Sequence, residues 1–213
     1  MLVMWVWAVW GATVVVAAVV QRLWVPRLRT PRIDDGETPP DFSGLGAPRF
    51  VLAAAALAAG AGWVFFAAPP HQWLAWVGFV AIGAPLVIVD AATTYLPNQL
   101  MYPLWGWVAA GLVVVLLFDP TASLGAALGA LAGYGAFWLV WRTSSSFGFG
   151  DVRLAAAVGA VAGMSGVTAW VLAFVVGTAL GAVAAIVAAL RKRSTLPYGP
   201  WLWLGPIVAL ALN

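Results

Sequence analysis

The sequence contains no cysteine. Disulfide bonds, cysteine-ligated zinc and thiol nucleophiles are therefore excluded. Charge is also scarce, because Asp, Glu, Lys and Arg make up only 8% of the 213 residues, whereas an ordinary soluble domain contains about 25%. A chain with so little charge cannot cover a surface that faces water. We therefore predict an integral membrane protein.

The charges that are present are unevenly distributed. Ten Lys and Arg against seven Asp and Glu give a formal net charge of +3. No basic stripe lies on a foldable soluble unit, which argues against nucleic-acid binding. Between residues 50 and 190 the charged positions are Asp90, Asp119, Arg142, Asp151 and Arg153. Each of them interrupts a hydrophobic stretch and needs an explanation.

Long hydrophobic runs occupy most of the chain. A helix that crosses the hydrocarbon core of a bilayer needs about 20 mostly apolar residues, and the runs between polar breaks predict about eight such helices. The candidate spans are 2–21, 50–68, 73–90, 101–118, 121–141, 151–165, 167–190 and 197–212. The predicted fold class is all-α, a polytopic helical membrane protein in which residues 1–213 form a single domain. The first run lacks the basic start of a signal peptide, so we expect a retained membrane helix.

The basic residues predict the orientation, because cytoplasmic loops collect Lys and Arg. With the N-terminus outside, all ten basic residues lie in or beside cytoplasmic segments. These segments are 22–49, 91–100, 142–150 and 191–196. The opposite loops contain no Lys or Arg. We expect 22–49 to be a short, irregular cytoplasmic loop within the domain.

Asp90 and Asp151 fall at the cytoplasmic ends of two predicted spans. An Asp at the centre of a membrane helix costs roughly 2.5 to 3.5 kcal/mol, and less near the interface, so two acids at matching depth call for a reason. Asp151 could cap a helix N-terminus or pair with Arg153. Asp90 is harder to explain structurally, because a negative charge at a helix C-terminus opposes the helix dipole. Asp119 lies in an outside DP turn and is expected to be a solvated loop residue.

The functional interpretation of the two acids is a pair of carboxyl groups that share a proton. The ionised member would take a proton from water while the protonated member polarises the carbonyl group under attack, as in aspartic proteases. Gly148 and Gly150 fit this interpretation, because the missing side chains beside Asp151 let a substrate backbone approach closely. From these residues alone, the structural and the functional interpretation both remain open.

Three motifs resemble those of the type IV prepilin peptidases, which are GxGD membrane aspartic proteases related to the archaeal preflagellin peptidases. FGFGDVRLAAAVG contains a GxGD motif and is similar to the family run GDxKLxAxxG, with Arg153 in place of the usual Lys. DAATTYLPN begins with Asp90 and ends in Leu-Pro-Asn, like the first catalytic segment of the family. LPYGPW, at 196–201, looks like the C-terminal IPFGPF segment. The resemblance covers the chain from Gly78 onward.

The resemblance implies an endopeptidase that cleaves the leader peptide of type IV prepilin-like proteins at the cytoplasmic membrane face, with Asp90 and Asp151 as the catalytic pair. It also implies further residues that bind the substrate. They are Gly148, Gly150, Pro97, Asn98, Arg153, Pro197, Gly199 and Pro200. The expected partners are the leader and N-terminal hydrophobic helix of a prepilin or pseudopilin, together with the lipid bilayer, and we expect no nucleic acid, metal or cofactor. The expected location is the inner (plasma) membrane, with several passes and the active site facing the cytoplasm.

The segment 22–49 departs from the larger members of the family. Bifunctional members have a larger cytoplasmic region, often with paired CxxC motifs, and also methylate the new N-terminus. Here the segment is short and contains no cysteine. The resemblance is therefore to a short form that lacks the cysteine-containing cytoplasmic domain, and we expect protease activity without N-methyltransferase activity.

Two other functions would use the same acids. A small proton-coupled carrier or an assembly scaffold would use Asp90 and Asp151 as proton sites. Carriers, however, usually hold such acids near the bilayer midplane and contain internal repeats, whereas these acids lie at span boundaries. A presenilin-like protease also has a GxGD motif, but its partner aspartate usually follows a Tyr, and Asp90 follows Val89.

Glycines recur at four-residue spacing in the second half of the chain. They are Gly125, Gly129, Gly133, Gly159, Gly163, Gly177 and Gly181. Small residues at this spacing let membrane helices approach closely. We therefore predict that these glycines form helix contacts.

Overall fold

The computed structural model describes residues 2–31, 39–144, 148–191 and 196–212. Within these ranges every regular element is a helix. Several charged residues, among them basic residues on which the predicted orientation depends, lie outside the described residues. They are Arg32, Asp34, Asp35, Glu37, Lys192 and Arg193.

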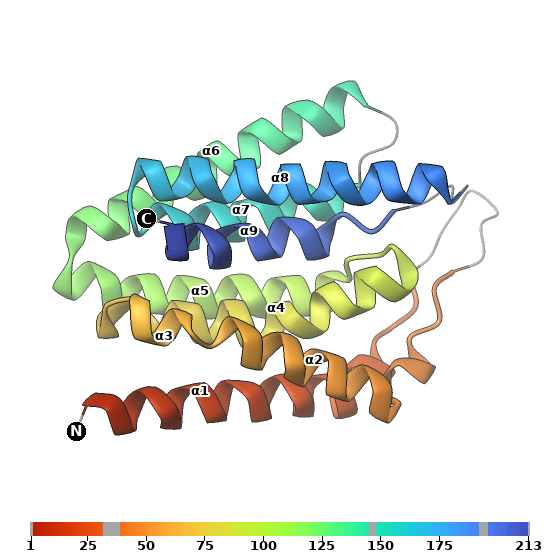
Figure 1. The fold of residues 1–213 in the computed structure, drawn as a ribbon, viewed down its shortest axis with the longest axis horizontal. Helices are drawn as coiled ribbons and strands as arrows, with labels where there is room; N and C mark the ends of the chain where they lie inside the picture. The colour runs from red at the N-terminus through yellow and green to blue at the C-terminus, as the bar shows by residue number, and fades with distance from the viewer. Residues whose placement is uncertain (1, 32–38, 145–147, 192–195, 213) are drawn as a thin grey trace.

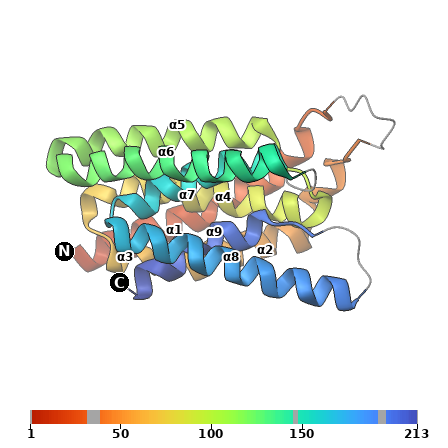
Figure 2. The same cartoon turned by 90° about the horizontal axis from the view of Figure 1, so that it is seen from above.

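The helices run side by side along one common direction, so that the chain passes back and forth between two ends (Figures 1 and 2). The α-helices are α1 (Leu2–Val19), α2 (Pro48–Ala61), α3 (Val64–Ala67), α4 (Trp73–Thr93), α5 (Asn98–Phe118), α6 (Pro120–Thr143), α7 (Phe149–Gly163), α8 (Val167–Leu190) and α9 (Gly199–Leu212). The shorter π- and 3-10-helical segments are η1 (Val20–Trp24), η2 (Val25–Arg27), η3 (Ser43–Gly46) and η4 (Pro70–Gln72).

The prediction of a polytopic all-α membrane protein is confirmed. Among the described residues, six helical segments are long and apolar enough to cross a membrane. The predicted spans at 151–165 and 197–212 correspond to α7 and α9, which have 15 and 14 residues and reach only about 21–22 Å at 1.5 Å per residue. Nearly all of α7 is buried. A helix enclosed by its neighbours does not have to match the bilayer thickness.

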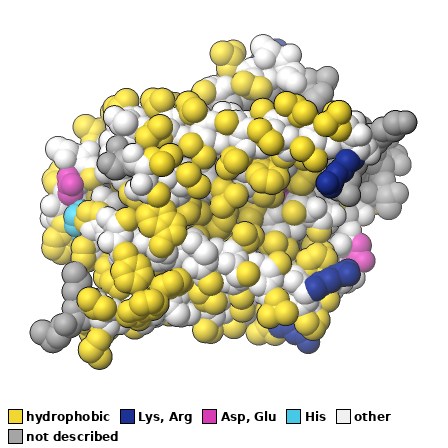
Figure 3. Space-filling model, in the orientation of Figure 1, with side chains coloured by type: hydrophobic (Ala, Val, Ile, Leu, Met, Phe, Trp, Pro, Cys, Tyr) yellow, Lys and Arg dark blue, Asp and Glu magenta, His cyan; other side chains and the backbone are white. Residues whose placement is uncertain are grey.

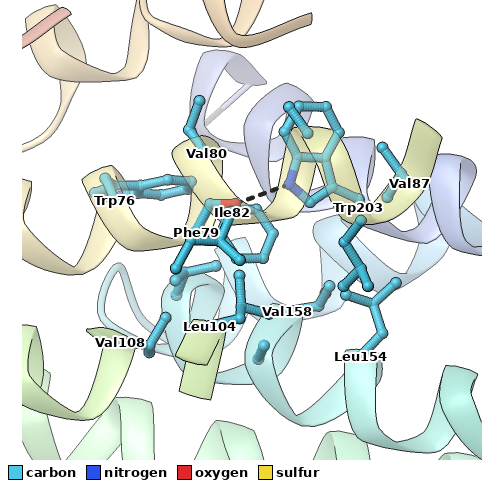
Figure 4. Close-up of a cluster of buried hydrophobic side chains, with 14 of the residues drawn as sticks. Trp76, Phe79, Val80, Ile82, Val87, Leu104, Val108, Leu154, Val158 and Trp203 are labelled. Carbon is cyan, nitrogen blue, oxygen red and sulfur yellow. Dashed lines mark hydrogen bonds between the residues drawn. The ribbon is translucent and has the colours of Figure 1, made fainter. Parts of the chain in front are cut away.

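α4 lies at the centre of the bundle, and most of its residues are buried. Figure 4 shows Trp76 and Phe79 of α4 in one cluster with buried side chains of α5, α7 and α9. Trp203 of α9 donates its indole N–H to the carbonyl oxygen of Phe79 at 3.1 Å. A side chain at Gly83 would overlap the Trp203 ring, so the glycine permits this contact. These interactions fix α4 and α9 relative to each other.

α6 and α7 meet along the predicted glycine spacing. A Cβ atom at Gly159 would overlap the backbone carbonyl of Gly129, and a Cβ atom at Gly129 would overlap that of Gly159. Gly163 and Gly125 form a second pair with the same close contact. The two backbones are therefore in direct contact, which only residues without side chains allow. The predicted helix contact is confirmed, and it places the start of α7 beside the end of α6.

The segment between α1 and α2 is anchored to the bundle at several described points. η1 and η2 continue the first helix to Arg27, beyond the predicted end at 21. Gln21 donates from Nε2 to the Leu45 carbonyl at 2.7 Å, and Arg22 donates to the Gly46 carbonyl at 2.6 Å. Side-chain contacts to backbone carbonyls thus hold the chain on both sides of the segment close together.

The two ends of the bundle differ in charge. We call the end where α4 finishes and α5 and α7 begin the Asp90 end, and the end where α5 turns into α6 the Asp119 end. Every Lys or Arg that the structure describes belongs to a segment at the Asp90 end. Figure 3 shows dark blue side chains at that end of the visible face, and hydrophobic side chains over the middle. This distribution is typical of a bundle that spans a bilayer.

Candidate active site

Asp90 lies in the last turn of α4, with only 4% of its surface exposed. The helix ends at Thr94, whose φ of 55° lies in the left-handed region and whose N–H donates to the Asp90 carbonyl at 2.7 Å. Non-glycine residues rarely adopt this conformation. After this turn, residues 95–97 cross the Asp90 end and lead to Asn98, the first residue of α5.

The carboxyl group of Asp90 is held by the start of α9. Its Oδ2 accepts a hydrogen bond of 2.9 Å from the backbone N–H of Gly199, which lies 109 residues away in the chain. The first N–H groups of a helix have no partner within the helix, so this contact satisfies both groups. A Cβ atom at Gly199 would lie 2.8 Å from Oδ2. Only glycine lets the α9 backbone come this close to the acid.

Asp151 is the third residue of α7, and 9% of its surface is exposed. Gly148 is the N-cap residue of this helix, so Asp151 is not the helix cap that the sequence left open. Its backbone N–H donates to the Gly148 carbonyl at 3.1 Å. Its Oδ1 atom is buried and has no hydrogen-bond partner. An orphaned carboxyl oxygen in such a place is costly to the fold.

Arg153 makes its contacts away from Asp151. It donates from Nη1 to the side-chain oxygen of Asn98, and its guanidinium lies 4.7 Å from the centre of the Phe149 ring. Its carbonyl oxygen accepts the indole N–H of Trp105 at 3.1 Å. The sequence left open an ion pair between Arg153 and Asp151 as a structural reason for Asp151. Arg153 instead makes contacts that connect α7 to α5.

Gly150 lets the turn after α4 pack against the start of α7. A Cβ atom at Gly150 would lie 2.8 Å from the Cβ of Leu96. Since Leu96 also approaches Gly199, its side chain lies between the starts of α7 and α9. The two glycines therefore allow three segments to converge around the acids.

Asp90 and Asp151 line a common cavity of about 280 Å³. The other lining residues are Thr94, Tyr95, Leu96, Asn98, Gly148, Phe149, Gly150 and Arg153. The two carboxyl groups are close enough for their charges to interact. A site of this kind can share one proton between two acids and hold a water molecule against them.

The cavity contains some of the predicted substrate-binding residues and not others. Gly148, Gly150, Asn98 and Arg153 line it. Gly199 lies outside the lining but contacts Asp90. Of the three prolines, Pro97 precedes α5, Pro197 lines a separate groove beside α8, and Pro200 is the second residue of α9.

Four lining residues were not predicted. They are Thr94, Tyr95, Leu96 and Phe149. All four lie within the quoted motifs, between or beside predicted positions, so the motif boundaries could have indicated them. Among the described residues, no group of three or more His, Cys, Asp or Glu is arranged to hold a metal ion.

The fold and the cavity define a class of protein, namely a multi-pass helical membrane protein with two buried carboxyl groups at one end. The model of the Type IV leader peptidase family matches residues 77–186. This match covers more than half of the chain and includes both acids. The chain belongs to the Type IV leader peptidase family, as the sequence resemblance predicted.

Several curated proteins are similar to this chain, and their names include "Prepilin leader peptidase/N-methyltransferase". The protein of that name from Burkholderia pseudomallei (strain 1026b) is 39% identical over 171 residues, which are 76% of this chain and 53% of that protein. The Neisseria gonorrhoeae protein is 34% identical over 152 residues, 67% of this chain and 50% of the relative. The Escherichia coli (strain K12) protein is 35% identical over 134 residues, which are 59% of this chain and 57% of that protein. The chain thus spans about half the length of these relatives, and no solved structure gave a significant match.

Proposed function

We propose that this protein is an aspartic endopeptidase of the inner membrane that removes the leader peptide of type IV prepilin-like proteins. The observation that carries the proposal is the cavity in which Asp90 and Asp151 lie together, within a chain of the Type IV leader peptidase family. The names of the relatives supply the substrate class. A pair of buried carboxyl groups supplies a chemistry that hydrolyses peptide bonds.

The different surroundings of the two acids suggest different roles. Asp90 accepts an N–H from Gly199, and a donor of this kind favours the ionised carboxylate. Asp90 is therefore the base that takes a proton from the attacking water. Asp151, with an oxygen that has no donor, is the protonated acid that donates to the carbonyl oxygen of the scissile bond. When the tetrahedral intermediate collapses, Asp90 gives its proton to the leaving amine and Asp151 takes back the proton of the hydroxyl group that it had protonated, which restores the pair with one shared proton.

The cavity lining supports the binding of an extended peptide. Gly148 lines the cavity beside Asp151 and has no side chain to keep a substrate backbone away, whereas the space beside Gly150 is filled by Leu96. Arg153 and Asn98 join the starts of α7 and α5 through their side chains, which holds the two walls of the cavity at a constant separation. We assign both residues a positioning role.

The active site is proposed to face the cytoplasm. All described basic residues belong to segments at the Asp90 end, and cytoplasmic segments of membrane proteins collect Lys and Arg. A leader peptide on that side would reach the acids while the apolar segment that follows it stays in the bilayer. The partners in this proposal are a prepilin or pseudopilin and the surrounding lipid.

Only the peptidase activity is extended to this chain. The N-methyltransferase activity in the names of the relatives needs a pocket for a methyl donor. The segment 22–49, where larger family members have their cysteine-containing region, is short in this sequence. The proposed reaction is hydrolysis alone.

Coexpression with a type IV prepilin tests the proposal. The wild-type chain should convert the precursor to a shorter form whose new N-terminus follows the leader. Asp90→Asn and Asp151→Asn should each abolish the conversion, because the amide keeps the shape of the side chain but cannot take part in proton transfer. Fractionation of the membrane should show equal accumulation of the three proteins.

Two results would overturn the proposal. One is a wild-type chain that accumulates in the membrane and leaves every prepilin tested uncleaved. The other is near-normal cleavage by either inserted variant, which would remove the assigned catalytic role. A carrier that uses the same acids as proton sites would give the first result.

A further inference from the structure

A second concave surface runs alongside the start of α7. It is a groove of about 270 Å³ formed by α5, α6 and α7, which we call the α5–α6 groove. Its floor consists of Ala156, Ala157 and Ala160 of α7, and Trp105 and Tyr134 contribute to its walls. Leu131, on its α6 side, is 70% exposed, so the groove opens to the surface of the bundle.

The arrangement of the helices creates this groove. α5 and α6 meet at the Asp119 end and then diverge toward the Asp90 end, where α7 begins (Figure 1). α7 contacts α6 along its glycines, and its alanines remain as the floor between the two diverging helices. Small residues on a membrane-facing surface allow the backbone of another helix to approach closely.

Trp105 connects the α5–α6 groove to the active-site cavity. Its ring lines the groove, while its indole N–H donates to the carbonyl oxygen of Arg153, which lines the cavity. The two concave surfaces are therefore neighbours along α7. A ligand that extends from the cavity along α7 toward the groove would pass Trp105.

The depth of the groove can be related to the position of the acids. Ala156 and Ala160 follow Asp151 by five and nine residues, which corresponds to about 8–14 Å along the axis of α7 at 1.5 Å per residue. A substrate helix that begins at the scissile bond and runs parallel to α7 has the same rise of about 1.5 Å per residue. Its residues about five to nine positions after the cleaved bond would lie over the alanine floor.

We infer that the α5–α6 groove binds the apolar helix that follows the cleavage site of the substrate. This inference rests on the proposed peptidase function, which requires a substrate with an extended segment at the acids and an apolar segment in the bilayer. The groove lies in the membrane-spanning part of the bundle, is lined by apolar and aromatic side chains, and adjoins the cavity. It aligns the substrate helix with α7 and delivers the leader junction to Asp90 and Asp151.

Other grooves on the bundle are less suitable for this helix. The groove between α6 and α8 includes Gly163, which lies twelve residues and about 18 Å beyond Asp151 on α7. The groove between α8 and α9 is formed by helices that carry neither acid, and Val183 lines it. These surfaces serve as comparison sites in the tests.

Photocrosslinking maps the contact directly. A photoreactive amino acid at Ala109, which lines the α5–α6 groove, should form an adduct with a coexpressed prepilin when the Asp151→Asn background prevents cleavage. The same probe at Ala110, its exposed neighbour on α5, and at Val183 should give little adduct. The attachment points on the prepilin should fall about five to nine residues after the scissile bond. Equal adducts at the three positions, or an adduct only at Val183, would overturn the inference.

Filling the groove tests its role in cleavage. Ala130→Leu adds volume inside the groove and should raise KM for the membrane-embedded prepilin about 5- to 100-fold, the range for overpacking a close contact. Ala132→Leu, two residues along the same helix and outside this groove, is the matched control and should leave KM unchanged. A truncated peptide that ends about four residues after the scissile bond, before the positions expected over the alanine floor, should be cleaved equally by the wild type and both variants, which also reports that the variants are folded.

The outcomes separate the groove from the proposed function. If the wild type cleaves the prepilin and Ala130→Leu cleaves it equally well, the inference fails and the peptidase function stands. Equal loss for the prepilin and for the truncated peptide would also overturn it, because the damage would then lie in the active site or the fold. If the wild type cleaves neither substrate, the peptidase function and the inference fail together.

Discussion

The two ends of the bundle each place an aspartate at a helix boundary, and the surroundings of the carboxyl groups are opposite. At the Asp119 end, Asp119 caps α6, accepting hydrogen bonds from the Ala122 N–H at 2.9 Å and the Thr121 hydroxyl at 2.7 Å. At the Asp90 end, Asp90 and Asp151 are 4% and 9% exposed. There Asp90 accepts the N–H of Gly199, and Oδ1 of Asp151 has no donor.

The difference separates an aspartate that stabilises the fold from aspartates that cost stability. The hydrogen bonds from Ala122 and Thr121 hold the pKa of Asp119 below its ordinary value of 3.8, so its charge is satisfied locally. Asp151 instead keeps a buried oxygen without a partner, which local structure does not explain. Groups that are buried, unsatisfied and clustered are typical of functional sites.

The sharpest test of this comparison is amide substitution at both ends. With purified protein and a prepilin substrate, Asp90→Asn and Asp151→Asn should each lower the cleavage rate by a factor on the order of 10²–10⁴, the usual contribution of an acid or base. Asp119→Asn retains a capping side chain, and it should leave the rate unchanged within about twofold. Equal losses at both ends would show that the comparison does not reflect function.

Gly199 tests how closely the site must be assembled. Gly199→Ala places a methyl group against Asp90 Oδ2 and should displace the carboxyl group, with a loss of roughly 10- to 100-fold in kcat, since small displacements of reacting groups have effects of this size. Gly106→Ala is the control, because a Cβ atom there meets nothing within 4 Å. Full activity of Gly199→Ala would mean that the contact with α9 does not position Asp90.

Arg153 tests the connection between α5 and α7. Arg153→Ala removes the contacts with Asn98 and the Phe149 ring, and we expect a decrease of about 2- to 10-fold in cleavage, the size of a single lost hydrogen bond. Asn98→Ala should give a similar decrease, and the double variant should be little worse than either single variant. Arg142→Ala changes an exposed Arg at the same end and should have no effect. A loss as large as that of Asp151→Asn would place Arg153 in the chemistry itself.

The smallest expected effect is on stability at the Asp119 end. Because the pKa of Asp119 is lowered in the folded state, its ionised form stabilises the fold above the ordinary value of 3.8, and this contribution is lost as the pH falls through the lowered pKa. Asp119→Ala should therefore unfold at a slightly lower temperature than the wild type in detergent at neutral pH. The difference should shrink in acid, as measured by thermal melts across a pH series. A difference that grows in acid would contradict this account of the cap.

Much of the fold was predictable because hydropathy acts locally. Runs such as 167–190 coincide with α8 (Val167–Leu190), and 73–90 ends inside α4 with Asp90 still in its last turn. The predicted spans of α7 and α9 were less informative. Their short lengths are possible because neighbouring helices enclose them. The hydropathy of a short stretch of sequence does not show which helices will pack around it.

The candidate site was predictable in its acids and less so in its lining. Asp90 and Asp151 are conspicuous because each interrupts an apolar run. Leu96 was not predicted, because its place against Gly150 and Gly199 follows from the left-handed turn at Thr94. Pro197 was expected at the substrate and lines another groove, because the order of residues in a motif does not say which face of the chain meets the cavity.

By itself, the sequence determined that this chain is a helical membrane protein and where its acids interrupt the spans, since transfer into a bilayer depends on the composition of each segment of about 20 residues. Only the tertiary structure decided that Asp90 meets an N–H group 109 residues away, that Arg153 turns from Asp151 toward Asn98, and that α5 and α6 diverge over α7. These features arise from close packing at glycines and from hydrogen bonds between distant segments. Such contacts form only when the helices have assembled.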